Sequence, residues 1–208
     1  MTGSRRFRRA GERGLLIEVT EGENTHALAR WLRDSAHADR LDEVVPGPRT
    51  VLAVADPDVL AAVARSVDSA PAVQERQATG HIVEVEVVYD GTDLESVCEQ
   101  TGLSRDEVVH LHSTATFLVD FFGFSPGLAF SAGVPDQLRV PRLETPRTTV
   151  PAGSLAVANQ YTVVYPGSTP GGWSIIGRSV SAPLWDPHRS PPNLVHVGDQ
   201  VRFRVVGP

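Results

Sequence analysis

The chain has 208 residues and a mass of 22.4 kDa, and its 41% hydrophobic and 21% charged residues are typical of a globular protein with one large or two small domains. A formal net charge of -6 and a pI near 5.6 argue against nucleic acid or an anionic membrane surface as a partner. The single cysteine, Cys98, excludes an intrachain disulfide and a cysteine-based zinc site, and it favours a reducing, cytoplasmic location.

The N-terminus is basic, with the sequence SRRFRR at residues 4–9. The apolar run after it is too short for the core of a signal peptide. We therefore expect a flexible basic N-terminal arm, neither exported nor spanning a membrane. Beyond the arm, residues 14–20 have the length and composition of a strand, and residues 25–35 show apolar positions at helical spacing.

Alternating patterns predict the rest of the first domain. Short strands at 43–45 and 50–55 flank a Pro-Gly-Pro corner, and an Asp-Pro pair at 56–57 fits the start of a second helix. Valine and glutamate alternate at 82–89, as in a half-buried strand. The order strand, helix, strand, strand, helix, strand favours a ferredoxin-like α+β domain over residues 1–89.

The second half of the chain predicts a β-barrel. Ser104 and Glu107 form a capping box, which starts a helix that ends near His112. Of the 16 prolines, 12 follow Phe124, so long helices are excluded and short strands joined by corners are expected. A closed barrel hides the edges of such strands, and we assign it to residues 90–208.

Several catalytic motifs are missing from the sequence. It has no phosphate loop, no dinucleotide-binding glycine motif, no nucleophile elbow and no zincin motif. His110 and His112 point about 200° apart on a helix, so we expect no bound metal at this pair. His112 alone is a candidate acid, base or hydrogen-bond donor, and the alternative is a structural histidine.

Three stiff corners carry the candidate site. The corner at 123–127, GFSPG, exposes backbone N–H groups that suit an anionic or carbonyl ligand, unless it is only a barrel corner. Arg142 and Arg147 each follow a proline, which fixes the preceding φ and aims a guanidinium group suited to carboxylate or phosphate. The alternative for each arginine is a surface ion pair.

The third corner follows Tyr165. Two adjacent glycines, Gly171 and Gly172, permit a ligand to approach the backbone closely. Trp173 is a candidate flat wall of the site, or else a core residue. Arg178 adds a third arginine near the end of a strand.

The ordered series GFSPGLAF, PR, PR, VPAGSLAVA, YP, STPGGWSIIGR, LWDP and VGDQVRF resembles the KipI family, also called PxpB. Its members are the B subunit of bacterial ATP-dependent 5-oxoprolinase and are often labelled allophanate hydrolase subunit 1. The resemblance runs from about Val83 to Phe203. It implies a ferredoxin-like N-terminal domain and a cyclophilin-like C-terminal barrel.

The resemblance also implies an activity and partners. In the family, the PxpB-type protein works with a KipA-like partner, the C subunit, and with a third protein, the A subunit. Together they open 5-oxoproline to glutamate at the expense of ATP, and the lactam is thought to be activated by phosphorylation. ATP with Mg²⁺ is thus the implied co-substrate, shared with the KipA-like partner. Leu128 and Phe130 replace an aromatic residue and a tyrosine of the family pattern, so the substrate need not be 5-oxoproline itself.

We assign catalytic roles to His112, Arg142 and Arg147. The residues assigned to substrate or anion binding are Phe124, Pro126, Gly127, Tyr165, Gly171, Gly172, Trp173 and Arg178. The alternative function is a non-catalytic regulatory protein, of the kind in this family that inhibits a sensor histidine kinase. A third, a peptide-binding barrel with prolyl isomerase activity, has no residue set in its favour.

Overall fold

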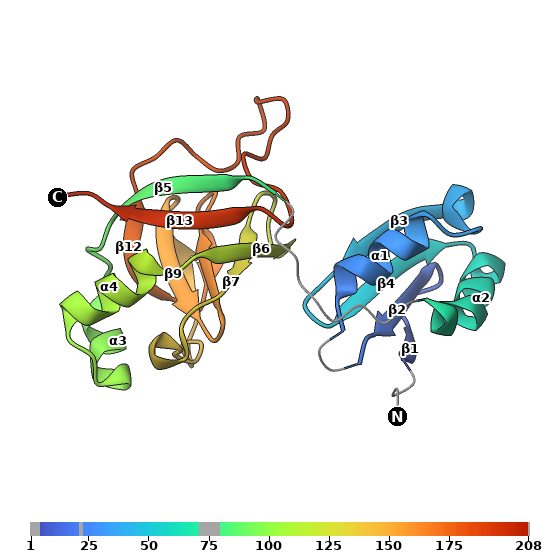
Figure 1. Ribbon diagram of the computed structural model, residues 1–208, viewed down its shortest axis with the longest axis horizontal. Helices are drawn as coiled ribbons and strands as arrows, with labels where there is room; N and C mark the ends of the chain where they lie inside the picture. The colour runs from blue at the N-terminus through green and yellow to red at the C-terminus, as the bar shows by residue number, and fades with distance from the viewer. Residues whose placement is uncertain (1–4, 21–22, 71–79, 208) are drawn as a thin grey trace. The chain divides into compact units, whose positions relative to one another are not determined.

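The computed structural model describes residues 5–20, 23–70 and 80–207. The chain forms two compact units, Met1–Gln77 and Ala78–Pro208. Figure 1 draws the first unit in blue to cyan and the second in green to red. Each unit has its own sheet and its own hydrophobic core, so each is described separately.

The first unit contains an antiparallel sheet of order β1-β2-β4-β3. Its elements are β1 (Arg6–Arg9), β2 (Gly14–Glu18), α1 (Thr25–Arg33), η1 (Ala38–Arg40), β3 (Leu41–Pro46), β4 (Thr50–Ala55), α2 (Pro57–Ser66) and η2 (Val67–Ser69). The side chain of Asn24 caps α1 by accepting hydrogen bonds from the backbone N–H groups of His26 and Ala27. Ile17, Leu28, Val51 and Val63 are fully or almost fully buried between the sheet and the helices.

The ferredoxin-like arrangement of the first domain is not confirmed. The strand expected after the second helix, β5 (Ile82–Val88), belongs to the second unit, where it pairs in parallel with β13 (Gln200–Val205). The edge strand beside β2 in the first sheet is β1 instead. The boundary between the units accordingly lies between Gln77 and Ala78, and not at residue 89.

The expectation of a flexible basic arm is wrong for residues 5–9. Phe7 packs against the first core from within β1. Arg5 is buried, forms an ion pair with Glu23 and donates hydrogen bonds to two backbone carbonyl groups. Phe7 thus holds the strand against the core, and the buried positive charge of Arg5, just before the strand, is offset by its acidic partner Glu23.

The second unit contains a closed barrel of order β10-β7-β6-β13-β5-β12-β9, which confirms the predicted barrel. Its remaining elements are α3 (Leu94–Thr101), α4 (Arg105–Thr114), β6 (Phe117–Phe122), β7 (Ala129–Ala132), η3 (Asp136–Leu138), β8 (Arg147–Val150), β9 (Ser154–Ala158), β10 (Tyr161–Val164), β11 (Thr169–Gly171) and β12 (Ser174–Ser179). β8 and β11 form a separate two-stranded ribbon. The capping box of Ser104 and Glu107 is present at the start of α4.

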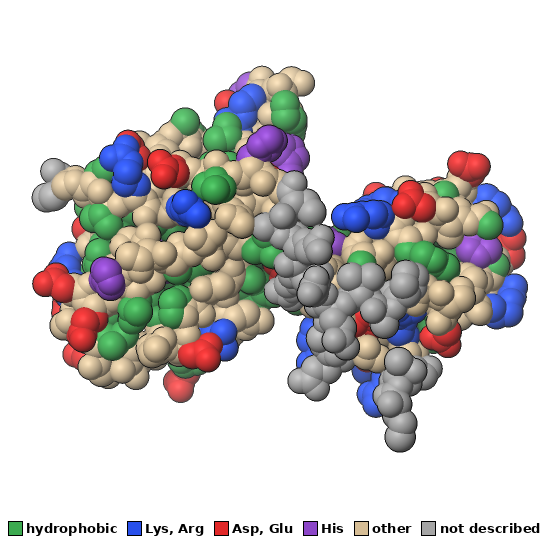
Figure 2. Space-filling view, in the orientation of Figure 1, with side chains coloured by type: hydrophobic (Ala, Val, Ile, Leu, Met, Phe, Trp, Pro, Cys, Tyr) green, Lys and Arg blue, Asp and Glu red, His purple; other side chains and the backbone are tan. Residues whose placement is uncertain are grey.

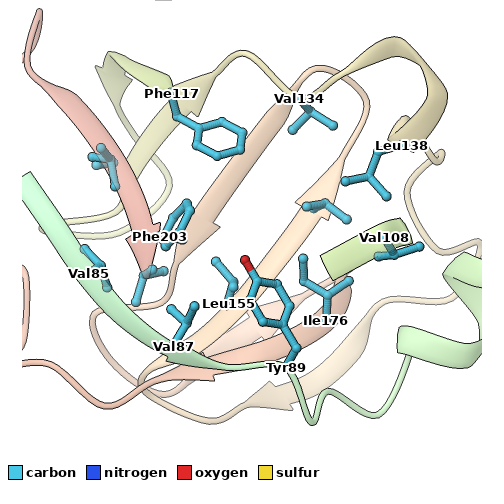
Figure 3. Packing of buried hydrophobic residues seen from close by; sticks show 14 of the residues in the cluster. Val85, Val87, Tyr89, Val108, Phe117, Val134, Leu138, Leu155, Ile176 and Phe203 are labelled. Carbon is cyan, nitrogen blue, oxygen red and sulfur yellow. The ribbon is translucent and has the colours of Figure 1, made fainter. Parts of the chain in front are cut away.

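Side chains fill the interior of the barrel (Figure 3). Val87, Phe117, Leu155 and Phe203 converge there from four different strands, and all are buried. Figure 3 also shows the hydroxyl group of Tyr89 pointing into this cluster. A small barrel packed in this way has a core and not a pore. The positions for a ligand must therefore be sought outside it.

Candidate functional site

The candidate site lies on the outer face of the barrel. Along β10, Thr162 and Val164 face the interior, where Thr162 contacts His112. Tyr161, Val163 and Tyr165 alternate with them and therefore face outward. Val163 and Tyr165 belong to a second buried cluster, separate from the barrel core. The members of this outer cluster are Leu128, Val150, Ala156, Val163, Tyr165 and Ile175, with Phe130 and Trp173 packed against it.

The β8–β11 ribbon brings one arginine of the predicted site to Tyr165. Arg147 begins β8 and pairs with Gly171 of β11. A side-chain carbon at Gly171 would overlap the Tyr165 hydroxyl oxygen, so this glycine is needed for the close approach. The carbonyl group of Gly172 accepts a hydrogen bond of 2.8 Å from the backbone N–H of Leu143. This bond holds the loop between Pro141 and Pro146 against the end of β11.

The charges of Arg142 and Arg147 both act on Tyr165. Burial raises the pKa of the Tyr165 hydroxyl, and the positive charges of the two arginines lower it in part. The net shift is upward, so this phenol is protonated at neutral pH and can donate a hydrogen bond. The pairing of Arg147 with Gly171 places this arginine beside the Tyr165 hydroxyl, and Arg142 contributes a second positive charge to its surroundings. That the two arginines bind an anion stays a prediction.

The two arginines are held differently. Arg147 donates from Nη2 to Asp93 Oδ1 at 2.5 Å, while its Nη1 is buried and has no hydrogen-bond partner among the described residues. Arg142 is exposed, and no ion pair or hydrogen bond of its side chain is found in the described part of the chain. Since Asp93 offsets one of the two positive charges, the group keeps a net positive charge that suits an anion.

Trp173 is half-buried beside the same cluster. Its ring meets Phe130 edge to face with centroids 5.4 Å apart, and Phe130 stacks on Phe121 at 4.4 Å. One side of Trp173 therefore packs as a core residue does, and the ring is not fully covered. Its role as a wall of the site stays a prediction. Phe130, where the family pattern has a tyrosine, contributes packing at this position and no hydroxyl group.

His112 lies in the barrel core, away from this group. Its side chain is fully buried between Phe117 and Phe203. Nδ1 is 2.8 Å from the Tyr89 hydroxyl and Nε2 is 3.0 Å from Thr162 Oγ1, and burial lowers its pKa to about 3. A neutral ring with both nitrogens occupied cannot exchange protons with a ligand. The structure therefore corrects its assignment as an acid or base to a structural one.

Among the described residues, no hydrogen bond or ion pair joins the remaining predicted residues to Arg142 or Arg147. Phe124 and Pro126 are exposed at the tip of the β6–β7 hairpin, where Phe124 has a positive φ of 66°. Gly127, with φ 75°, lies against the indole of Trp185. Arg178 forms an exposed ion pair of 2.9 Å with Asp90, which is the surface alternative weighed for the other arginines.

Asp93 was not predicted as a site residue, although it contacts Arg147. Its only sequence signal is an acidic residue just before a helix, where an N-cap is the ordinary explanation. Tyr89 and Thr162 were not predicted either, because only the fold brings residues so far apart in the chain to both nitrogens of one histidine.

The described residues contain neither a membrane-spanning helix nor a cluster of metal ligands. No described helix has the length and apolar character to cross a membrane. Within the same residues, no three histidine, cysteine, aspartate or glutamate side chains gather as metal ligands would. On the face shown in Figure 2, basic and acidic side chains are interspersed over each unit.

Comparisons with known proteins agree on one family. Residues 5–195 match the carboxyltransferase domain, subdomain C and D. The 5-oxoprolinase B subunit of Escherichia coli O157:H7 is 46% identical over 124 residues, which are 58% of this chain and 56% of that protein. The corresponding protein of Bacillus subtilis strain 168 is 40% identical over 133 residues, or 62% of this chain and 55% of that one. The chain thus spans little more than half the length of these relatives.

Solved structures give the same fold. The crystal structure of TTHA0988 superposes with a TM-score of 0.78 at 36% identity, covering 94% of this chain and 40% of that chain. The Kluyveromyces lactis urea amidolyase superposes with a TM-score of 0.77 over 97% of this chain and 15% of that chain. At 18% identity, the second likeness concerns the fold alone.

Proposed function

The chain belongs to the carboxyltransferase domain family, subdomain C and D, and from this premise we propose that it is the B subunit of an ATP-dependent lactam or amide hydrolase of the 5-oxoprolinase type. Relatives named as the B subunit of 5-oxoprolinase, at 37% to 46% identity, support this proposal and the resemblance to the KipI family. In this function the chain acts in the cytoplasm with a KipA-like partner, the C subunit, and with a third protein, the A subunit.

The observation that carries the proposal is the group formed by Arg142, Arg147 and Tyr165. A lactam is a stable amide, and its oxygen becomes a leaving group once it is phosphorylated. Negative charge develops on the transferred group, and guanidinium groups positioned beforehand stabilise that charge. The protonated Tyr165 hydroxyl adds a neutral donor beside them. Gly171 keeps the backbone close to that hydroxyl.

The donor set fits the phosphate part of a nucleotide better than its metal. Guanidinium forks match phosphate oxygens, and Arg147 Nη1 is a buried donor without a partner among the described residues. Since those residues contain no cluster of metal ligands, we propose that Mg²⁺ arrives with ATP and that the KipA-like partner shares in holding it. ATP, when bound, supplies the phosphoryl group that activates the lactam.

The test is an assay of the complex. The full chain is co-expressed with the product of the neighbouring reading frame, and ADP release is measured with 5-oxoproline and with urea-like amides. We expect substrate-dependent ADP release, reduced at least about tenfold by Arg142→Ala or Arg147→Ala because each removes a charge-assisted contact. Arg139→Ala, which removes a surface arginine paired with Asp136, is the matched control and is expected to retain activity.

Two results would contradict the proposal. One is the lack of stimulation by any lactam or urea compound in a complex that co-purifies. The other is inhibition of a sensor histidine kinase that is unchanged in the double variant Arg142→Ala, Arg147→Ala, since a regulatory protein acts through an exposed surface and does not need the anion site.

A further inference from the structure

Asp93 occupies the N-cap position of α3 without capping it. An aspartate at this position ordinarily accepts a hydrogen bond from the first turn of its helix. Here the side chain makes no such bond. It is instead turned toward the outer cluster, and the residue is only 9% exposed. A residue that gives up its local role while buried and charged is held by other contacts.

Those contacts join three segments. Asp93 Oδ1 accepts from Arg147 Nη2 at 2.5 Å, and Oδ2 accepts from the backbone N–H of Ile175 at 2.7 Å. The backbone N–H of Asp93 in turn donates to the Ile175 carbonyl at 2.9 Å. Asp93 therefore satisfies both backbone groups of Ile175, two residues beyond Trp173, in the manner of a neighbouring strand. The carboxylate of Asp93 thus holds both the start of β12 and the guanidinium group of Arg147 in β8.

The ion pair determines which donor of Arg147 remains available. With Nη2 held by Asp93, the guanidinium plane is fixed, and Nη1 is left buried and without a partner among the described residues. Buried donors in folded proteins are nearly always paired. An anion bound beside Tyr165 supplies the missing acceptor.

We propose that Asp93 is the positioning residue of the anion site: it orients Arg147 so that Nη1 faces the bound oxyanion. This inference rests on the proposed function, which supplies the oxyanion. Asp93 itself does not touch the ligand. Its effect on binding is transmitted through Arg147, and that route makes it distinguishable from a residue that merely stabilises the fold.

The test is a double-mutant cycle on the full chain, with inorganic phosphate and 5-oxoproline as probes in calorimetric titrations. Asp93→Asn keeps an oxygen for the Ile175 N–H and removes the ion pair. We expect it to weaken probe binding about tenfold, and to have little effect in an Arg147→Ala background. Asp90→Asn breaks the exposed pair with Arg178 in the same turn, and is expected to change binding by less than about twofold.

A second measurement does not depend on a ligand. In the ¹⁵N spectrum of arginine side chains, assigned with Arg147→Lys, the held guanidinium is expected to give separate Nη signals that merge in Asp93→Asn. Equal signals in both proteins would overturn the role of Asp93, as would additive losses in the cycle. A third outcome is a wild-type chain that binds neither probe, although its Nη signals change in Asp93→Asn. This result would overturn the proposed function and the claim that Nη1 faces an anion. It would leave intact only the claim that Asp93 fixes the guanidinium group of Arg147.

Discussion

Replacing His112 by phenylalanine tests the structural role of this histidine. The phenylalanine ring fits the space between Phe117 and Phe203 but has no nitrogen. Thr162 Oγ1 donates to the Ala156 carbonyl, so it accepts from Nε2–H, and Nδ1 is left to accept from the Tyr89 hydroxyl. The histidine is therefore neutral, with its proton on Nε2.

The size of the effect follows from these contacts. In His112→Phe the buried Tyr89 hydroxyl loses its acceptor and Thr162 loses one donor. An unpaired buried polar group costs about 1–3 kcal/mol, and the changed ring shape adds to this. We expect the free energy of unfolding to fall by about 2–4 kcal/mol at pH 7.5.

The effect should also depend on pH. The pKa of His112 is lowered from 6.5 to about 3 by burial, so below pH 6.5 the unfolded chain binds a proton that the folded chain excludes. The stability of the wild type therefore falls as pH falls from about 6.5 toward 3, by about 1.4 kcal/mol per unit. The variant lacks this loss. The difference between the two should shrink by about 2 kcal/mol between pH 6.5 and 4.5, because the unfolded histidine is already half protonated at pH 6.5.

The assay is urea unfolding of the full chain in a Trp31→Phe background, so that fluorescence reports on Trp173 and Trp185 in the barrel unit. His110→Gln, an exposed histidine on the same helix, is the control and is expected to stay within about 0.5 kcal/mol. A His112→Phe protein with unchanged stability and lost activity would refute the structural assignment. If the difference in free energy of unfolding between wild type and His112→Phe does not change with pH, the link between stability and the protonation of His112 is refuted.

Three further predictions concern single residues. Arg5→Ala should lower the stability of the first unit by about 3–5 kcal/mol, followed by circular dichroism in urea, because it removes the positive charge beside the buried carboxylate of Glu23 and leaves only Thr20, among the described residues, to donate to it; an unchanged midpoint would contradict it. Gly171→Ala should weaken phosphate binding in titrations without unfolding the chain, because its methyl group displaces the Tyr165 hydroxyl. Phe124→Gly should raise the free energy of unfolding by about 1 kcal/mol, because this exposed residue has a φ of 66°; a loss of stability would show that its ring packs usefully.

The sequence predicted what depends on local chemistry. The capping box at Ser104, the start of α2 at Pro57 and the barrel of short strands each follow from residues that dictate their own backbone conformation. The place of β5 was wrong for a related reason. Its alternating valines predict a half-buried strand but contain no information on which sheet it joins, and its partner, β13, lies at the far end of the chain.

The site residues likewise divide into those that the local sequence reveals and those that only the fold reveals. Proline before Arg142 and Arg147 is visible in the sequence, and both positive charges lower the pKa of the Tyr165 hydroxyl in part. Their role in binding an anion stays a prediction. Burial is not visible there, so the sequence leaves both a reactive and a structural role open for His112, and only the fold shows that the barrel encloses it. Asp93 was missed because a carboxylate before a helix has a common local explanation, and only the tertiary fold shows that it is turned elsewhere.

The position of the site on the outer face has a consequence for catalysis. His112, Phe117 and Phe203 occupy the barrel interior, so the proposed anion site has one side open to solvent. Electrostatic stabilisation by guanidinium groups is strongest when water is excluded. Arg147 is already half-buried and oriented by Asp93, whereas Arg142 is exposed. In the proposed complex, a partner protein covers Arg142 and excludes water from it, and on this ground we expect the proposed activity to require both chains.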